Sequence, residues 1–134
     1  MDFEGLKKYS TVSLRVGLAI VLFWFAFAQF KNPSSWANLV PAYATTVTSA
    51  MNIVYMNASL EVVMASLILI GLYTRVVATV FTIHIIPIIL ALGLSSPSGI
   101  RDVGIFFATL SLAISGSDYL SMDSFMKKTR KKSK

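Results

Sequence analysis

Residues 53–73 read IVYMNASLEVVMASLILIGLY, and this stretch decides the fold. It contains a single charged side chain, Glu61, in an otherwise apolar run. A bilayer core about 30 Å thick requires about 20 mainly apolar residues per helix, and this run meets that requirement. Three further stretches also meet it, at residues 13–30, 76–94 and 98–120. The sequence therefore predicts an all-α integral membrane protein, built as a four-helix bundle.

The composition supports a membrane protein and excludes several kinds of redox centre. Of the 134 residues, 55% are hydrophobic and only 13% are charged. The chain has no cysteine and His84 is its single histidine. Disulfides, iron–sulfur clusters, thiolate metal sites and bis-histidine haem ligation are therefore excluded. We expect no metal site and no intrinsic cofactor, so any redox centre would belong to another protein.

The basic residues orient the predicted helices, because Lys and Arg in short loops stay on the cytoplasmic side. With the N-terminus inside, ten of the 12 basic residues lie on the cytoplasmic side, and Lys31 and Arg101 lie outside. We therefore predict a plasma-membrane protein with both termini cytoplasmic. The ten are Lys7, Lys8, Arg15, Arg75, Lys127, Lys128, Arg130, Lys131, Lys132 and Lys134.

The chain is predicted to consist of a transmembrane domain, residues 1–124, and a basic cytoplasmic tail, residues 125–134. We expect this tail to be disordered and held near anionic lipid headgroups, at about 1 kcal/mol per basic residue. The alternative is a tail that docks on a partner protein. The lipid bilayer explains the net charge of +6 better than nucleic acid does, because the basic residues flank the apolar spans.

The connection between the first two spans, residues 31–52, is predicted to be an interfacial cap. Pro33 and Pro41 interrupt any long helix, and Trp36 and Tyr43 carry rings that favour the headgroup region. The alternative is an ordinary exposed loop.

The first span has a competing interpretation as a cleaved signal peptide. Lys7 and Lys8 precede an apolar run, and Ala26-Phe27-Ala28 resembles a cleavage site. The bulky aromatic residues of the run favour a retained helix. Removal of this helix would also spoil the charge pattern.

A polar cluster is predicted near the outer leaflet, because an ionisable side chain in a membrane helix costs about 2.5 kcal/mol or more near the bilayer centre. Glu61 lies about 12 Å from the outer end of its span, at about 1.5 Å per residue. Asn57 lies one turn above Glu61, and Arg101 is the expected partner of the Glu61 carboxylate. The cluster either binds a ligand or only fixes helix packing. The candidate ligand-binding residues are Gln29, Asn57, Glu61, Arg101 and Asp102.

His84 is the second candidate for proton handling beside Glu61. It precedes Pro87, a residue that can kink the third span. At about 1.5 Å per residue His84 comes within reach of Glu61, so that a Glu–His pair could pass a proton. The alternative is a histidine that only packs.

Two helix faces are predicted to lie against neighbouring helices. The face of the first span is predicted because its residues recur at helical spacing. The face of the fourth span is predicted because its small residues permit close approach. The remaining charges receive milder explanations: Arg15 and Arg75 reach the headgroups, while Asp118 and Asp123 form weak surface pairs near the tail. The first face comprises Arg15, Leu18, Ala19, Leu22, Ala26 and Gln29, and the second Gly104, Ala108, Ser111 and Ser115.

Several segments, in order, resemble the DoxX family of small four-helix membrane proteins. The resemblance covers about residues 12–123. Where the family often carries a glycine, an acidic residue and a lysine, this chain has Ala26, Ala28 and Gln29. The segments are WFAFAQFKNP at 24–33 with Trp36 and Pro41, Glu61, GLYTR at 71–75, His84, IRDVG at 100–104 and YLSMD at 119–123.

The resemblance implies an auxiliary or quinone-interacting subunit of a membrane redox complex, similar to thiosulfate:quinone oxidoreductase or quinol oxidase. It implies a bound quinone and a redox-enzyme partner or a second copy of this chain, with Glu61, Arg75, Arg101 and Asp102 as pocket or packing residues. Catalysis by this chain alone is not expected. The alternatives are a non-enzymatic binder or carrier of a small molecule or lipid, and a structural assembly factor.

Overall fold

The structure, a computed structural model, describes residues 3–132, and every regular element within that range is a helix. Four helices are long and apolar enough to cross a membrane, which confirms the predicted all-α membrane bundle. The last lysine of the charge count, Lys134, lies outside the described residues. The elements are α1 (Phe3–Lys31), α2 (Pro33–Ala37), η1 (Ala42–Thr46), α3 (Ala50–Ile70), α4 (Thr74–Leu92), α5 (Pro97–Ser115) and α6 (Met122–Lys132).

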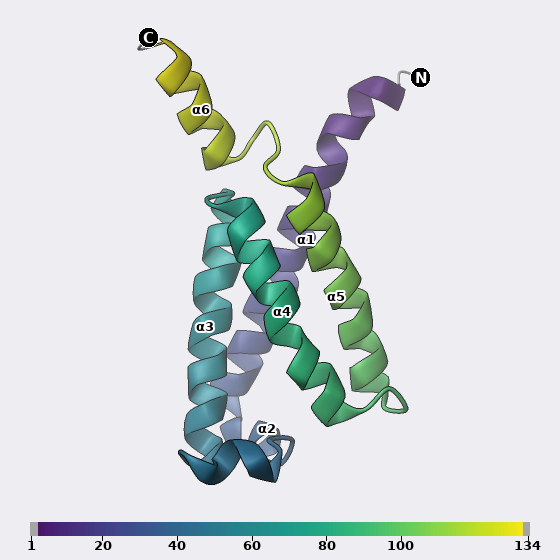
Figure 1. The fold of residues 1–134 in the computed structure, drawn as a ribbon, viewed down its shortest axis with the longest axis vertical. Helices are drawn as coiled ribbons and strands as arrows, with labels where there is room; N and C mark the ends of the chain where they lie inside the picture. The colour runs from purple at the N-terminus through teal and green to yellow at the C-terminus, as the bar shows by residue number, and fades with distance from the viewer. Residues whose placement is uncertain (1–2, 133–134) are drawn as a thin grey trace.

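The long helices form two packed pairs, α1 with α3 and α4 with α5. The described chain begins and ends at the same end of the bundle, and α2 and η1 cross the opposite end (Figure 1). We refer to these as the terminal end and the cap end. The predicted cap between the first two spans is thus a pair of short helices. Pro33 occupies the first turn of α2, where its missing N–H has no helical partner to lose.

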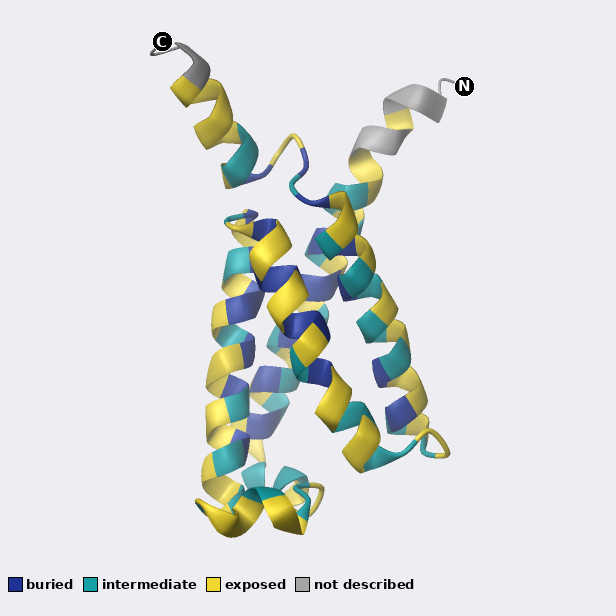
Figure 2. Cartoon of the chain, viewed as in Figure 1, coloured by how far each residue is buried: buried dark blue, intermediate teal, exposed yellow. Residues whose placement is uncertain are grey.

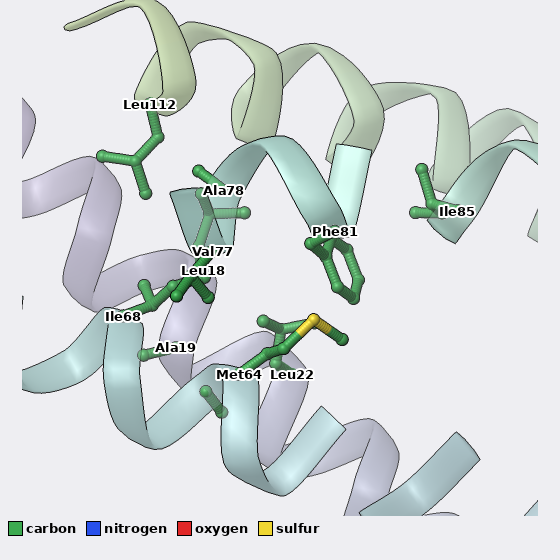
Figure 3. Close-up of a cluster of buried hydrophobic side chains, with 11 residues drawn as sticks. Leu18, Ala19, Leu22, Met64, Ile68, Val77, Ala78, Phe81, Ile85 and Leu112 are labelled. Carbon is green, nitrogen blue, oxygen red and sulfur yellow. The ribbon is translucent and has the colours of Figure 1, made fainter. Parts of the chain in front are cut away.

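The apolar core lies between the two helix pairs (Figure 3). Leu22, Ile68 and Leu112, from three different helices, are almost completely buried. All six residues of the predicted α1 face are buried, which confirms that face. Its spacing of three or four residues places one side of the helix against α3, as the helical period requires.

The outer surface of the bundle is also apolar (Figure 2). Trp24, Phe27, Ile83 and Phe107 each expose more than half of their surface. In water this pattern would leave a large apolar surface exposed to solvent, whereas in a bilayer the lipid chains cover it. The chain is therefore a multi-pass membrane protein.

The predicted small-residue face of α5 is wrong. Gly104, Ser111 and Ser115 are exposed and only Ala108 packs against the core, whereas the buried face carries Asp102, Thr109 and Leu112. The hydroxyl of Thr109 lies 3.0 Å from that of Thr82 on α4, so a polar contact holds this pair of helices together.

Helix α5 ends at Ser115, before the predicted limit of the fourth span at residue 120. Gly116 has φ 77°, a conformation that favours glycine, and its N–H donates to the carbonyl of Leu112 at 2.8 Å. The chain then leaves the helix axis. As a result Asp118 lies against α1.

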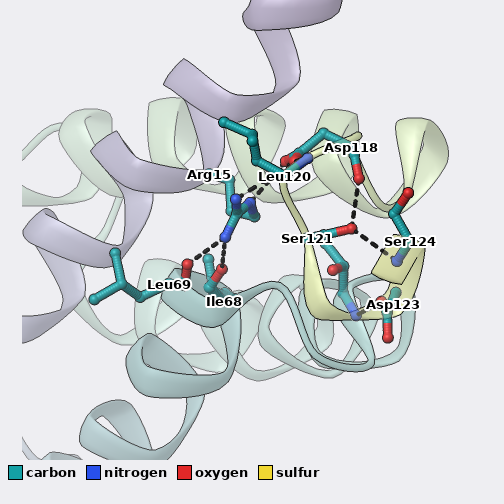
Figure 4. Close-up of polar contacts among 9 residues, drawn as sticks. Arg15, Ile68, Leu69, Asp118, Leu120, Ser121, Asp123 and Ser124 are labelled. Carbon is teal, nitrogen blue, oxygen red and sulfur yellow. Dashed lines mark hydrogen bonds and ion pairs between the residues drawn. The ribbon is translucent and has the colours of Figure 1, made fainter. Parts of the chain in front are cut away.

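A buried ion pair closes the terminal end (Figure 4). Arg15 Nε lies 2.7 Å from Asp118 Oδ2, and both side chains are less than a twentieth exposed. The guanidinium also donates to the carbonyls of Ile68, at 3.0 Å, and Leu69 at the end of α3. The predicted headgroup position of Arg15 and the predicted surface position of Asp118 are therefore wrong. The predictions for both residues depend on their distance along the sequence from the membrane edge. That distance cannot reveal a contact between residues 103 positions apart.

Asp123 is likewise not a weak surface partner of the tail. Its carboxylate accepts the backbone N–H groups of Tyr73, at 2.8 Å, and Thr74, at 2.9 Å, at the start of α4. Helix N-termini carry unpaired N–H groups and favour a negative charge. Gly71, with φ 71°, closes α3, and a Cβ on it would lie 2.5 Å from Ser121 Cβ. The turn after α3 thus requires glycine both for its conformation and for the approach of the chain before α6.

The predicted disordered tail is also wrong over the described residues, because α6 runs from Met122 to Lys132. The hydroxyl of Ser121 accepts the N–H of Ser124 at 3.2 Å, in the manner of an N-cap. Asp123 adds an acidic group to the first turn. The basic residues that follow have good helix propensity, so charge alone did not predict disorder correctly.

Substitution Asp118→Asn tests the ion pair. It leaves the buried Arg15 guanidinium without its carboxylate, so we expect the free energy of unfolding to fall by about 3 to 5 kcal/mol. Reversible unfolding in detergent micelles, followed by circular dichroism, measures the change. The double variant Arg15→Met/Asp118→Leu removes both charges and should recover much of the loss. Unchanged stability in Asp118→Asn would contradict a structural role for the pair.

Candidate functional site

A cavity of about 410 Å³ lies at the cap end of the bundle. All four long helices and the cap segments contribute to its walls. Phe25, Trp36 and Phe81 provide aromatic surface, and the ring centroids of Phe25 and Trp36 are 5.9 Å apart at a near-perpendicular angle. This contact attaches α2 to α1 and places the cap over the cavity. The polar or charged lining residues are Gln29, Ser35, Tyr43, Asn57, Glu61, His84, Ser98, Arg101 and Asp102.

Glu61 is buried on the cavity wall, with 6% of its surface exposed. Its Oε2 accepts from Gln29 Nε2 at 2.6 Å, and its Oε1 accepts from Asn57 Nδ2 at 2.9 Å. Gln29 belongs to the buried face of α1, and Asn57 precedes Glu61 by one turn of α3. The structure thus brings together three of the five predicted ligand-binding residues in one hydrogen-bonded cluster.

The donors of this cluster are fully used within the protein. Asn57 Nδ2 donates to Gln29 Oε1 at 2.9 Å as well as to Glu61, and Gln29 Nε2 also donates to the carbonyl of Phe25 at 3.3 Å. Each amide nitrogen has two hydrogens, and all four are directed to acceptors. Because these nitrogens only donate, both Glu61 oxygens accept, as they do in a carboxylate.

His84 joins the cluster through Asn57 rather than through Glu61. The distance from His84 Nε2 to Asn57 Oδ1 is 2.8 Å. With Asn57 Nδ2 turned to Glu61, its Oδ1 can only accept, so the hydrogen must lie on His84 Nε2. The predicted direct Glu–His pair is therefore replaced by a Glu61–Asn57–His84 relay. Sequence spacing could not place an α3 amide between two ionisable groups on different helices.

The predicted pairing of Arg101 with Glu61 is wrong. Arg101 Nε lies 2.8 Å from Asp102 Oδ1, and the guanidinium carbon lies 4.4 Å from the ring centroid of Phe25. The neighbouring carboxylate and the aromatic face satisfy the cation at the end of its own helix. Asp102 is buried whereas Arg101 is partly exposed. Both nonetheless line the same cavity as Glu61, so the five predicted residues share one site.

Sequence reasoning missed the apolar part of the site. Phe81, Ile85 and Ile88 of α4 line the cavity together with Leu39 of the cap. Individually these residues look like ordinary lipid-facing or core residues. Only Trp36 and Tyr43, aromatic residues in the short connection that contains Pro33 and Pro41, were predicted from the sequence. Among the described residues no group of three or more His, Cys, Asp or Glu side chains could hold a metal ion.

The chemistry that the cavity can support follows from its lining. Aromatic and aliphatic walls suit a flat apolar molecule, and a few convergent polar groups can fix its orientation. His84 can exchange a proton, and the Arg101 guanidinium has more N–H groups than its bond to Asp102 uses. The remaining N–H groups of Arg101 suit carbonyl or carboxylate oxygens of a ligand.

Comparisons with known proteins match the chain to a family and to a similar protein. The family model of DoxX matches residues 10–94, a range that contains Glu61 and His84 but not Arg101 and Asp102. A protein of Bacillus subtilis (strain 168), named "Putative oxidoreductase CatD", is 25% identical over 127 residues, which is 92% of each chain. No solved structure matches the chain.

The relay predicts the Nε2–H tautomer for His84 whenever its imidazole is neutral. Because the chain has one histidine, ¹⁵N-histidine labelling reports on this residue alone. We expect a protonated Nε2 and an unprotonated Nδ1 in bilayer samples at about pH 8, where an ordinary imidazole is neutral. Asn57→Leu removes the acceptor and should abolish this preference, whereas Ser66→Ala, an exposed change on the same helix, should keep it. A protonated Nδ1 in the unmodified protein would contradict the relay.

Proposed function

This chain belongs to the DoxX family, and from that premise we propose that it is a quinone-interacting, auxiliary subunit of a membrane redox system. The observation that carries the proposal is the cap-end cavity, where an aromatic and aliphatic wall faces the Gln29–Asn57–Glu61–His84 cluster. The name of the Bacillus subtilis relative points to the same class of chemistry.

The residues of the cavity fit a quinone headgroup. Its volume of about 410 Å³ falls within the range of about 300 to 1,000 Å³ that is usual for small-molecule sites. Phe25, Trp36 and Phe81 offer ring faces for a flat molecule. Arg101 on α5 offers donors for a carbonyl oxygen, whereas neutral His84 on α4, whose single N–H is directed to Asn57, offers Nδ1 as an acceptor for a hydroxyl group.

The protein's own contribution would be to bind and orient the ring and to hold protons. When bound, a quinone supplies the two-electron chemistry that the side chains lack. Glu61, His84 and the Asn57 amide between them form a proton-holding group beside the cavity. The chain has no cysteine and one histidine, so we propose that electrons come from a partner redox enzyme.

One feature of the site favours a second candidate, a structural assembly factor. All four amide hydrogens of Gln29 and Asn57 already have acceptors in the protein, so the cluster holds α1 against α3 without any ligand. In this case the cluster would stabilise the helix arrangement that a partner complex requires. The two candidates differ in whether the cavity is occupied.

Quinone retention tests the proposal and separates the candidates. Protein extracted in mild detergent is assayed for bound quinone, with the unmodified chain compared with Glu61→Gln and with Ser66→Ala as an unrelated change on α3. Glu61→Gln removes the charge to which Gln29 and Asn57 donate and thereby disturbs the polar wall of the cavity, so we expect quinone retention to fall about threefold or more.

Three outcomes of this assay would each contradict a different part of the proposal. Equal, stoichiometric retention in Glu61→Gln would remove Glu61 from the site. Absence of quinone from every variant would reject the quinone cavity. A Glu61→Gln protein that loses helical content, with no ligand in the unmodified chain, would favour the assembly factor.

We further propose that the chain lies in the plasma membrane with its terminal end in the cytoplasm. The basic residues of α6 and Arg75 lie at that end, whereas Lys31 and Arg101 lie at the cap end. Positive charge is retained on the cytoplasmic side, which supports this orientation.

Single-cysteine labelling tests the orientation without removal of native cysteines, because the chain has none. The experiment uses cells whose plasma membrane is intact but whose outer layers have been removed. In these cells a membrane-impermeant thiol reagent should label Thr46→Cys in the cap. It should label Lys128→Cys on α6 only after lysis. The reverse pattern would contradict the proposed orientation.

A further inference from the structure

A second hollow lies at the terminal end, remote from the cap-end cavity. It has a volume of about 390 Å³ and lies where the start of α4, the end of α5 and the first turns of α6 meet. Its polar lining includes Arg75, Lys127, Ser115, Ser117 and Asp123. The proposed quinone function uses none of these side chains. We call this hollow the basic groove.

The charges of the basic groove favour an anion. Among the described residues Arg75 forms no ion pair, and its hydrogen bond to the carbonyl of Ile114 is long, at 3.4 Å. Asp123 lines the groove, but its two oxygens are already bonded to backbone N–H groups of Tyr73 and Thr74. Two cations and three hydroxyl-bearing residues, Tyr73, Ser115 and Ser117, therefore line the space, against one carboxylate whose charge is locally compensated.

The position of Arg75 is built into the fold. Gly116 has φ 77°, and a Cβ at this residue would lie 3.0 Å from Arg75 Cγ and nearer still to its Nε. Only a glycine lets the arginine stem lie along the chain as it leaves α5. The same glycine ends α5 and thereby places Ser115 and Ser117 beside the guanidinium.

The surroundings of the groove indicate what kind of anion it meets. Val76 and Ile114, next to Arg75 in the fold, expose 62% and 70% of their surface along the membrane-spanning helices. On α6, Met122, Phe125 and Met126 recur at helical spacing and are exposed beside the basic residues. Basic helices with such an apolar face lie in the headgroup region of anionic membranes. A soluble anion would make no contact with these exposed apolar side chains, whereas the acyl chains of a lipid would.

We propose that the basic groove binds the phosphate of an anionic phospholipid. The guanidinium of Arg75 and the ammonium of Lys127 contact the phosphate, and the hydroxyls of Ser115 and Ser117 donate to it. The acyl chains lie along the exposed apolar surface of α4 and α5. Lys127, on the first turns of α6, completes the groove.

Lipid titration of the purified full-length chain, followed by native mass spectrometry, tests the proposal. Phosphatidylglycerol and phosphatidylcholine are the probes. We expect stronger binding of phosphatidylglycerol, and about tenfold or greater weakening in Arg75→Gln/Lys127→Gln. The charge-matched control is Lys128→Gln/Arg130→Gln, which removes two charges from α6 outside the groove and should weaken phosphatidylglycerol binding less than the groove variant does.

Each other outcome would overturn the assignment. Equal weakening in both double variants would show diffuse attraction to the basic helix. Equal binding of the two lipids would remove the anionic preference. Complete displacement of phosphatidylglycerol by millimolar inorganic phosphate would identify the free ion as the ligand. If the groove variant loses helical content, the single variants Arg75→Gln and Lys127→Gln replace it, and each should weaken phosphatidylglycerol binding more than Lys128→Gln does.

Discussion

A carboxylate buried among membrane helices has to receive its hydrogen bonds from the protein, because lipid chains offer no donors. Glu61 receives them from Gln29 on α1 and from Asn57 on α3, and Asn57 extends the contact to His84 on α4. These bonds fix the rotation of three helices relative to one another. The arrangement of the cap-end cavity depends on that registration, because its apolar walls come from the same helices.

A different polar device fixes the terminal end. The Arg15 guanidinium joins α1 to the last carbonyls of α3 and to Asp118, while Asp123 binds the first N–H groups of α4. Between these two polar ends lies an apolar core without ionised groups. The bundle can therefore be held together by polar contacts at the terminal end and still leave a cavity between the helix pairs at the cap end.

The sequence predicted the helices and the inward face of α1 well, because apolar length and helical period are properties of single segments. The five residues that it named for ligand binding all line the cap-end cavity, and their binding role stays a prediction. The predictions that proved wrong were those of side-chain contacts. Arg101 bonds its neighbour Asp102, Arg15 bonds Asp118 from the far end of the chain, and His84 reaches Glu61 through Asn57. Each depends on the relative rotation of two helices, which a hydropathy pattern does not contain. The helical tail was missed because its N-cap, Ser121, forms only when the chain turns at Gly116.

We propose that the cap-end cavity is a ligand site with the Glu61 cluster in its wall. The most direct measurement is an experimental density map of the chain, extracted together with its native lipids. We predict flat non-protein density between Trp36 and His84, with a polar atom within hydrogen-bonding distance of His84 or Arg101. A cavity filled by the chain's own side chains, with the Gln29–Asn57–Glu61 bonds intact, would contradict the claim and leave the cluster a purely structural role.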